Sequence, residues 1–255
     1  MWNQLNTGEY EGMLAQTISF QGYNRDWVHG YYVRPLTGKK IGSIVLIPHM
    51  PGWDEYCREA SRRFAQHGYA VLCPDIYCRI GHGTPSEVAA LAREQGGLAD
   101  ACVMGDVQGA VDFLKAQPLS NQKAGVIGMC SGGRHAFLAA CSIAGLDGAV
   151  DCWGGGVVMA KDQLSDKRPI APIDLTSDLS CPLLGIFGND DHSPTSDQVD
   201  LHEAKLKECG KDYQFFRYDG CGHGFWYYHT EMYRPKAAME SFEQVLSFFE
   251  KTLSL

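Results

Sequence analysis

The stretch from 124 to 140, AGVIGMCSGGRHAFLAA, limits the possible fold more than any other part of the chain. It reads as a buried apolar strand, a cysteine between glycines, and a helix of small residues. Cys130 is the centre of a G-x-C-x-G frame, the spacing of a nucleophile elbow, in which a sharp turn raises a reactive side chain above the carboxyl end of a strand. A larger side chain at Gly128 or Gly132 would push the strand and the helix apart. The helix that follows would favour a thiolate at Cys130 and an oxyanion beside it, through its free N–H groups and its dipole.

This stretch also has a plainer interpretation, in which Cys130 is a small buried core residue, as free cysteines often are. The rest of the chain favours the elbow, because apolar runs alternate with segments of helical spacing. That alternation predicts an α/β fold with a mainly parallel central sheet covered by helices on both faces. The expected strands cover 41–48, 69–74, 123–128, 148–153, 182–188 and 212–218, and the expected helices cover 54–67, 98–117, 195–209 and 235–253.

Three further segments complete the expected organisation. Residues 14–34 predict an antiparallel hairpin at the edge of the sheet. Residues 75–97 are irregular and polar, and we expect them to form a loop over the carboxyl edge of the sheet. Residues 158–179 predict a surface loop beside the site. With 255 residues, 45% of them hydrophobic, and no linker, we expect one domain over 1–255.

Charge and cysteine content exclude several classes of protein. The net charge of -8 argues against a nucleic-acid-binding surface, which needs clustered Lys and Arg. Ten cysteines without a C-x-x-C pair predict reduced thiols in a cytoplasmic protein. The N-terminal sequence MWNQLNTGEYEGMLAQ lacks the pattern of a targeting segment, and no apolar run approaches the roughly 18 residues that a membrane helix needs.

Two glycine-flanked turns supply an acid and a histidine after the elbow. The acid turn reads GNDDH, and we prefer Asp191 over Asp190 because such turns commonly read Gly-x-x-Asp, counted here from Gly188. The second turn, DGCGHGF, presents His223 as a general base, although a loop histidine packed under glycines is the alternative. The order nucleophile, acid, histidine is that of an α/β-hydrolase, in which the acid orients the imidazole and the imidazole activates the nucleophile, here Cys130.

His192 lies beside these acids and invites a metal interpretation. No H-x-x-x-H or H-E-x-x-H pair accompanies it, so we expect a solvated loop histidine, no metal and no cofactor.

From about Ile44 to Phe249 the chain resembles the dienelactone hydrolase family. The resemblance rests on GMCSGG around Cys130, CPDIY at 73–77 followed by Arg79, FGNDDH at 187–192 and GHGF at 222–225. It implies an α/β-hydrolase fold and a cysteine hydrolase with a triad of Cys130, His223 and Asp191. The implied substrate is an ester or lactone, often a carboxymethylenebutenolide.

The same resemblance implies roles for three further residues. The backbone N–H groups of Ser131 and Met50 would donate to the oxyanion, and such donors typically contribute a few kcal/mol in the transition state. Arg79 stands where the family places a guanidinium that binds the substrate carboxylate.

The chain departs from the family at two places. His49 replaces a glutamate that controls protonation of the resting thiol; we expect a histidine here to hold a proton near neutrality and to pair with the Cys130 thiolate in the substrate-binding region. Trp226, Tyr227 and Tyr228 follow the histidine turn without the family's second arginine. Trp226 either lines an aromatic substrate pocket or packs under the last helix.

The leading hypothesis is therefore a hydrolase of a small-molecule lactone or ester, acting as a monomer or small homo-oligomer without nucleic-acid or membrane partners. A general carboxylesterase or thioesterase is a variant of it. A non-hydrolytic ligand-binding protein on the same fold is the first alternative, because a fold does not fix a function. Redox sensing at a low-pKa Cys130 is the second.

Overall fold

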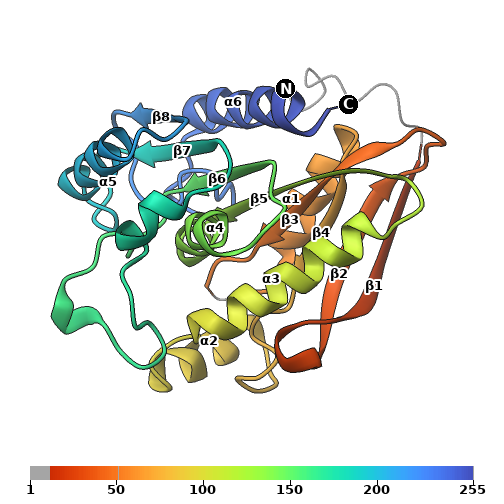
Figure 1. Cartoon of the computed structure of the whole chain (residues 1–255), viewed down its shortest axis with the longest axis horizontal. Coiled ribbons are helices and arrows are strands. Elements are labelled where there is room, and N and C mark those ends of the chain that lie inside the picture. The colour runs from red at the N-terminus through yellow and green to blue at the C-terminus, as the bar shows by residue number, and fades with distance from the viewer. Residues whose placement is uncertain (1–11, 51, 255) are drawn as a thin grey trace.

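The computed structural model describes residues 12–50 and 52–254 and is built on a central sheet (Figure 1). The eight strands follow the spatial order β1-β2-β4-β3-β5-β6-β7-β8. Most of the N-terminal stretch that we interpret as lacking a targeting segment, residues 1–11, lies outside the described residues. The strands are β1 (Met13–Gln21), β2 (Trp27–Pro35), β3 (Ile41–Ile47), β4 (Ala70–Pro74), β5 (Ser120–Met129), β6 (Gly148–Cys152), β7 (Leu183–Gly188) and β8 (Tyr213–Tyr218).

The sheet is mainly parallel, which confirms the predicted fold class. β3 to β8 pair in parallel, while β2 runs antiparallel to both β1 and β4. All seven residues of β3 are buried, as its mostly aliphatic sequence, IGSIVLI, predicts for a strand covered on both faces. β1 and β2 form the antiparallel pair at the edge, in register from Met13↔Pro35 to Gln21↔Trp27.

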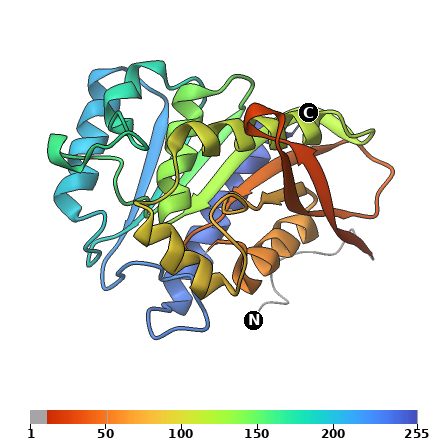
Figure 2. The ribbon, with the colours of Figure 1, turned by 90° about the horizontal axis from the view of Figure 1, so that it is seen from below.

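Helices cover both faces of the sheet, above and below the strands in Figure 2. Alternate residues of β3 belong to different apolar clusters, because successive side chains of a strand point to opposite faces. The cluster with Val45 and Ile47 packs against α3 (Asp100–Lys115) and α4 (Ser131–Ser142), and the cluster with Ile44 and Leu46 packs against α1 (Glu55–Gln66) and α6 (Pro235–Leu253). The last helix of this alternation is α5 (Ser196–Glu208), which follows β7.

One helix was missed by the sequence prediction. The segment 75–97, expected to be irregular, contains α2 (Pro85–Glu94). Thr84 and Glu87 form a capping box, and Pro85 occupies the first turn. Those start signals are visible in the sequence, but only Ala89 and Ala92 of this helix are buried, so the apolar periodicity is weak.

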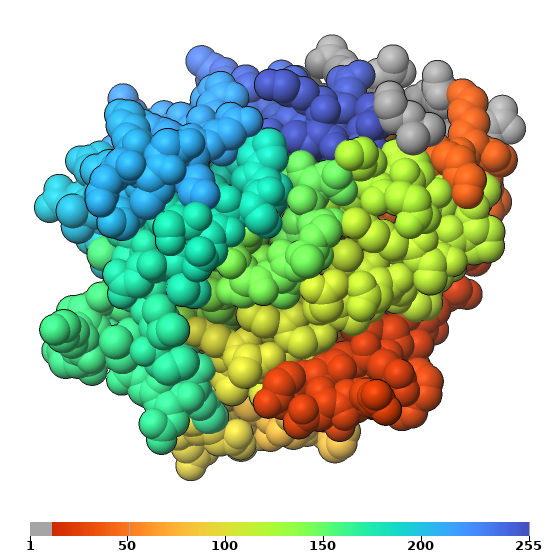
Figure 3. All heavy atoms as spheres, viewed as in Figure 1, coloured from red at the N-terminus to blue at the C-terminus, as the bar shows by residue number. Residues whose placement is uncertain are grey.

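The segment 158–179 contains two short 3₁₀ turns, Lys161–Gln163 and Pro172–Asp178. In the space-filling view it forms a lobe at the left edge of the molecule (Figure 3). Within the described residues, no helix is both long enough and apolar enough to cross a bilayer.

Candidate active site

Cys130 stands at the junction of β5 and α4 in a strained backbone conformation. Its φ of 56° and ψ of -124° lie in a region that non-glycine residues rarely occupy. The backbone holds this turn from both sides, because Cys130 N donates to Cys152 O at 3.0 Å and Gly133 N donates to Cys130 O at 2.9 Å. The sulfur is thereby carried at the carboxyl end of β5, where the predicted elbow places it.

The flanking glycines are required by close backbone contacts. A Cβ added at Gly128 would lie 2.0 Å from the carbonyl oxygen of Gly132, and one added at Gly132 would lie 2.3 Å from the carbonyl oxygen of Ile47. These distances agree with the steric reason given for the G-x-C-x-G frame. They also show that the start of α4 packs directly on the end of β3.

The acid turn and the histidine turn meet beside the elbow. Nδ1 of His223 lies 2.9 Å from Oδ2 of Asp191, and Oδ1 of Asp191 accepts from the backbone N of Ser193 at 2.8 Å. Both carboxylate oxygens are therefore held, and the side chain is only 1% exposed. Asp190 points to solvent, so the structure brings Asp191 rather than Asp190 together with the histidine.

The surroundings of His223 give its ring a high affinity for a proton. Burial lowers the pKa of His223, but hydrogen bonding to Asp191 and to the Cys130 side chain outweighs burial and raises the pKa to about 10. With Nδ1 facing Asp191, Nε2 remains as the ring nitrogen for Cys130. An imidazole oriented in this way can act as a general base toward a neighbouring nucleophile.

A cavity of about 370 Å³ opens over these side chains. Cys130, Ser131 and His223 line it, together with Gly155 and residues 190–193 of the acid turn. This volume lies in the range of small-molecule sites, roughly 300–1,000 Å³. The arrangement can hold a small substrate against both the sulfur and the imidazole.

The predicted oxyanion donors lie on segments that adjoin at the elbow. Ser131 is the first residue of α4, and Met50 lies in the turn after β3, on which α4 packs. In the described part of the chain, neither backbone N–H donates a hydrogen bond to another residue. Their role as oxyanion donors stays a prediction.

His49 does not pair with Cys130 through a hydrogen bond, because both of its ring nitrogens have other partners. Nδ1 lies 2.8 Å from the Tyr227 hydroxyl, and Nε2 lies 2.8 Å from Oδ2 of Asp54. Burial lowers the pKa of His49, but its hydrogen bond to Asp54 and the neighbouring Cys57 side chain raise it to about 9. The raised pKa agrees with the expectation that His49 holds a proton near neutrality. The hydrogen-bond partner of the ring is the carboxylate of Asp54 at the α1 N-cap, however, and not the Cys130 thiolate.

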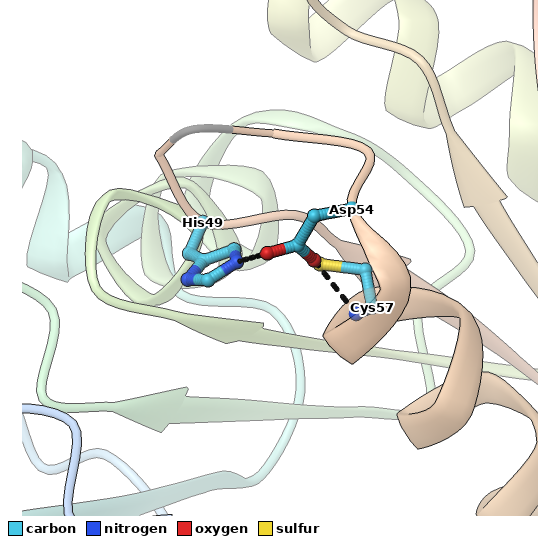
Figure 4. A group of neighbouring side chains, drawn as sticks. All are labelled: His49, Asp54 and Cys57. Atoms are coloured by element: carbon cyan, nitrogen blue, oxygen red, sulfur yellow. Dashed lines mark hydrogen bonds and ion pairs between the residues drawn. The ribbon is translucent and has the colours of Figure 1, made fainter. Parts of the chain in front are cut away.

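His49, Asp54 and Cys57 also form a cluster in which each side chain offers a metal-ligating atom, all within 4.8 Å of one another (Figure 4). The contact of 2.8 Å between His49 and Asp54 is shorter than the separation of about 3.3 Å between two ligands of a tetrahedral zinc ion. Asp54 also caps α1 by accepting from Cys57 N at 2.9 Å. Hydrogen bonding accounts for this cluster without a metal.

Arg79 is committed to two carboxylates away from the cavity around Cys130. Its guanidinium contacts both oxygens of the fully buried Asp106 at 2.7 and 3.0 Å, and Asp26 at 3.0 Å. Asp106 also accepts from the backbone N of Tyr23 in the hairpin turn. The observed contacts of Arg79 therefore tie the hairpin turn to α3, and the structure does not bring Arg79 together with Cys130.

Trp226 packs under the last helix, α6, which is the second of the two placements expected from the sequence. Its Nε1 donates to Ser241 Oγ at 2.7 Å, and the residue is 5% exposed. Tyr228 bonds to Glu59 at the surface. Tyr227 is the aromatic residue of this run that approaches the site, through its contact with His49.

Tyr77 is a site residue that our sequence prediction did not single out. A Cβ at Gly52 would lie 2.6 Å from its ring, which places Tyr77 against the turn that carries Met50. Burial raises the pKa of Tyr77, the Ser131 side chain opposes this rise, and the charge of Cys130 adds to it. Tyr77 also lines a second cavity of about 200 Å³ with Trp53. The sequence signal that could have identified Tyr77 is its place in the CPDIY motif.

The fold and the elbow together define the class of protein. A mainly parallel sheet with this strand order, and a nucleophile turn after β5 followed by an acid turn after β7 and a histidine turn after β8, is the α/β-hydrolase architecture. Solved structures share the fold. One titled "Putative Dienelactone Hydrolase", from Klebsiella pneumoniae, superposes with a TM-score of 0.86 at 24% identity and covers 94% of this chain and 100% of its own.

The model of the dienelactone hydrolase family matches residues 28–253, and the chain belongs to that family. It is a hydrolase acting on ester bonds, the class to which lactones belong. A relative from Methylorubrum extorquens, named "Putative carboxymethylenebutenolidase", is 27% identical over 227 residues, which are 88% of this chain and 77% of the relative. A dienelactone hydrolase-like promiscuous phosphotriesterase from metagenomic libraries has a TM-score of 0.76 at 20% identity, covering 95% of this chain and 99% of its own.

Proposed function

We propose that this protein hydrolyses a small-molecule lactone or ester through a triad of Cys130, His223 and Asp191 and a covalent acyl-enzyme. One observation carries the proposal. Cys130 and His223 line one cavity, while Asp191 Oδ2 lies 2.9 Å from Nδ1 of the His223 imidazole. The names of the curated relatives, carboxymethylenebutenolidases, support a lactone as the substrate.

The proposed first half-reaction forms a thioester. His223 Nε2 takes the proton of Cys130 Sγ, and the sulfur attacks the substrate carbonyl carbon. The carbonyl oxygen becomes an oxyanion, stabilised by the N–H groups of Ser131 and Met50. The C–O bond then breaks, and the leaving alkoxide takes the proton from His223. In a lactone this hydroxyl stays attached to the acyl group.

The second half-reaction releases the acid. His223 takes a proton from water, the hydroxide attacks the thioester carbon, and the C–S bond breaks. The proton returns to the sulfur, so one water is consumed for each ester bond. Asp191 keeps the imidazole in the required tautomer throughout.

The ion pairs of Arg79 bear on the choice of substrate. Its guanidinium already faces two carboxylates, so recognition of a substrate carboxylate by this residue requires breaking them. Neutral esters are therefore tested beside carboxylated lactones. The free state of all ten cysteines supports a cytoplasmic setting.

The test compares wild type with Cys130→Ala on a panel of lactones and esters. We expect the variant to lose about 10⁴-fold in kcat/KM, because the nucleophile is removed while the cavity remains. Cys102→Ala, on α3, is the matched control and should stay within about twofold. Turnover by Cys130→Ala at the wild-type rate would overturn the proposed nucleophile.

A further inference from the structure

Two segments distant in sequence meet at His49: the turn after β3 with the start of α1, and the turn that carries His223. His49 directly precedes Met50 in the turn after β3, Asp54 is the N-cap of α1, and Tyr227 lies in the turn that carries His223. The two hydrogen bonds of His49, each 2.8 Å long, join these segments (Figure 4 shows His49 and Asp54). His49 is 5% exposed, so water does not compete freely for its ring nitrogens.

The protonation of His49 determines which way the Tyr227 hydroxyl bond runs. An ionised Asp54 only accepts, so Nε2 of His49 carries a hydrogen in either state of the ring. In the imidazolium, Nδ1 also carries a hydrogen and donates to Tyr227, which leaves the phenol proton free for another acceptor. In the neutral ring, Nδ1 has only a lone pair, so the phenol must donate to it.

Tyr227 belongs to the buried apolar cluster against which Cys130 packs. Burial raises its pKa well above the usual value, and the charges of Tyr56 and Cys130 add to the rise. Its ring packs edge-on against Tyr56 at 4.7 Å and Trp153 at 6.0 Å between centroids, which fixes the ring. A phenol held this way can offer its proton to negative charge developing near Cys130.

We propose that His49 is a positioning residue: its imidazolium donates to both Asp54 and Tyr227, ties the oxyanion turn to the catalytic histidine turn, and turns the Tyr227 proton toward the reacting centre. This role rests on the proposed hydrolysis at Cys130. In the described residues His49 makes no hydrogen bond to Cys130 and does not line the cavity around it, so it acts through Tyr227.

The groups around His49 favour the charged ring. The titratable side chains that face it are Asp54, Cys57 and Tyr56 from the start of α1 and Tyr227 from the histidine turn. Burial raises the pKa of Asp54, but the hydrogen bond and charge of His49 outweigh it and hold the pKa below the usual value. With the pKa of His49 near 9, kcat should fall as pH rises through that value, because deprotonation reverses the Tyr227 bond.

Asp54→Asn separates this account from a merely structural one. The amide oxygen can still cap α1 by accepting from Cys57 N, as Asp54 Oδ1 does at 2.9 Å. The amide nitrogen now donates to Nε2, so the neutral ring takes the Nδ1–H tautomer and donates to Tyr227 at every pH. The alkaline fall of kcat near pH 9 should therefore disappear, with KM unchanged.

Two further variants complete the kinetic test. Tyr227→Phe should lower kcat about tenfold and also remove the alkaline fall, because no hydroxyl is left to turn. Tyr228→Phe, the adjacent surface tyrosine bonded to Glu59, is the control and should keep both the rate and the fall. An alkaline fall that persists in Asp54→Asn or Tyr227→Phe would overturn the inference.

An NMR titration of the histidine imidazoles gives a readout that does not need turnover. We expect His49 to titrate near pH 9 in wild type and below its usual pKa in Asp54→Asn, where burial is no longer opposed by a carboxylate. A wild-type value below 7 overturns the inference alone. Turnover that survives in Cys130→Ala overturns the proposed function instead, so the two failures are distinguishable.

Discussion

Two histidine–aspartate pairs of nearly equal geometry flank the elbow, and they differ in their access to the cavity around Cys130. The contact is 2.9 Å long in His223–Asp191 and 2.8 Å in His49–Asp54. Both imidazoles have a raised pKa, about 10 and about 9. The His223 side chain is 30% exposed at the cavity, whereas that of His49 is 6% exposed and has both nitrogens occupied.

This difference shows that the residue types, the contact distance and the pKa of a histidine–aspartate pair do not by themselves assign its role. A general base needs a ring nitrogen that can exchange protons with the reacting atoms, and of these two histidines only His223 lines the cavity with Cys130. His49 lacks that access, and its proposed influence on catalysis runs through its hydrogen bonds to Tyr227 and Asp54. The predictions below test this division of roles.

The sharpest contrast replaces each histidine by glutamine. His223→Gln should lower kcat/KM about 10⁴-fold, because it removes the base, whereas His49→Gln should lower it about tenfold through Tyr227. Steady-state kinetics on one ester measures both. Equal losses would erase the distinction between the two pairs.

The elbow glycine connects both pairs, because Gly132 packs on the end of β3 that leads to His49. Gly132→Ala puts a Cβ 2.3 Å from Ile47 O and should lower the free energy of unfolding by about 3–4 kcal/mol. Gly38→Ala, which meets nothing within 4 Å, is the control and should change it by less than about 0.5 kcal/mol. Chemical denaturation measures both, and a matched small effect would show that the elbow tolerates the extra atom.

Arg79 extends the comparison to a charged group without access to the cavity around Cys130. Arg79→Met leaves Asp106 buried without its cation and should lower the free energy of unfolding by about 2–3 kcal/mol, with KM unchanged. A KM that rises more than tenfold for carboxylated lactones, but not for neutral esters, would instead support the predicted substrate role of Arg79.

Trp226 should give the smallest effect. Trp226→Phe removes its hydrogen bond to Ser241 and should lower the free energy of unfolding by about 1 kcal/mol, measured by denaturation. KM should not change, because the indole packs under α6. A change in KM with unaltered stability would place Trp226 at the substrate.

The parts of the site that sequence predicted are those fixed by local backbone geometry. The elbow at Cys130 and the turns of Asp191 and His223 each depend on a few adjacent residues with glycines at fixed offsets, and strand order then brings the turns to one edge. The fold class followed from the alternation of apolar runs. α2 was missed because its few buried residues give a weak period despite its capping signals.

Pairings between distant residues were not predictable from the sequence. Arg79 was predicted to bind a substrate carboxylate, but the carboxylate that it contacts is Asp106 on α3, and this pairing depends on how α3 packs against the hairpin turn. The bond between His49 and Tyr227 joins residues 178 positions apart. Such contacts follow from tertiary packing, which short motifs do not encode.

The most direct test of the central claim is the mass of the protein during turnover of an activated ester. Acid quenching within the first turnover should trap one acyl group on the peptide that contains Cys130, as a thioester sensitive to hydroxylamine. His223→Gln should slow both its formation and its loss. An acyl group on another residue, or turnover without any acylated protein in a burst experiment, would contradict the account.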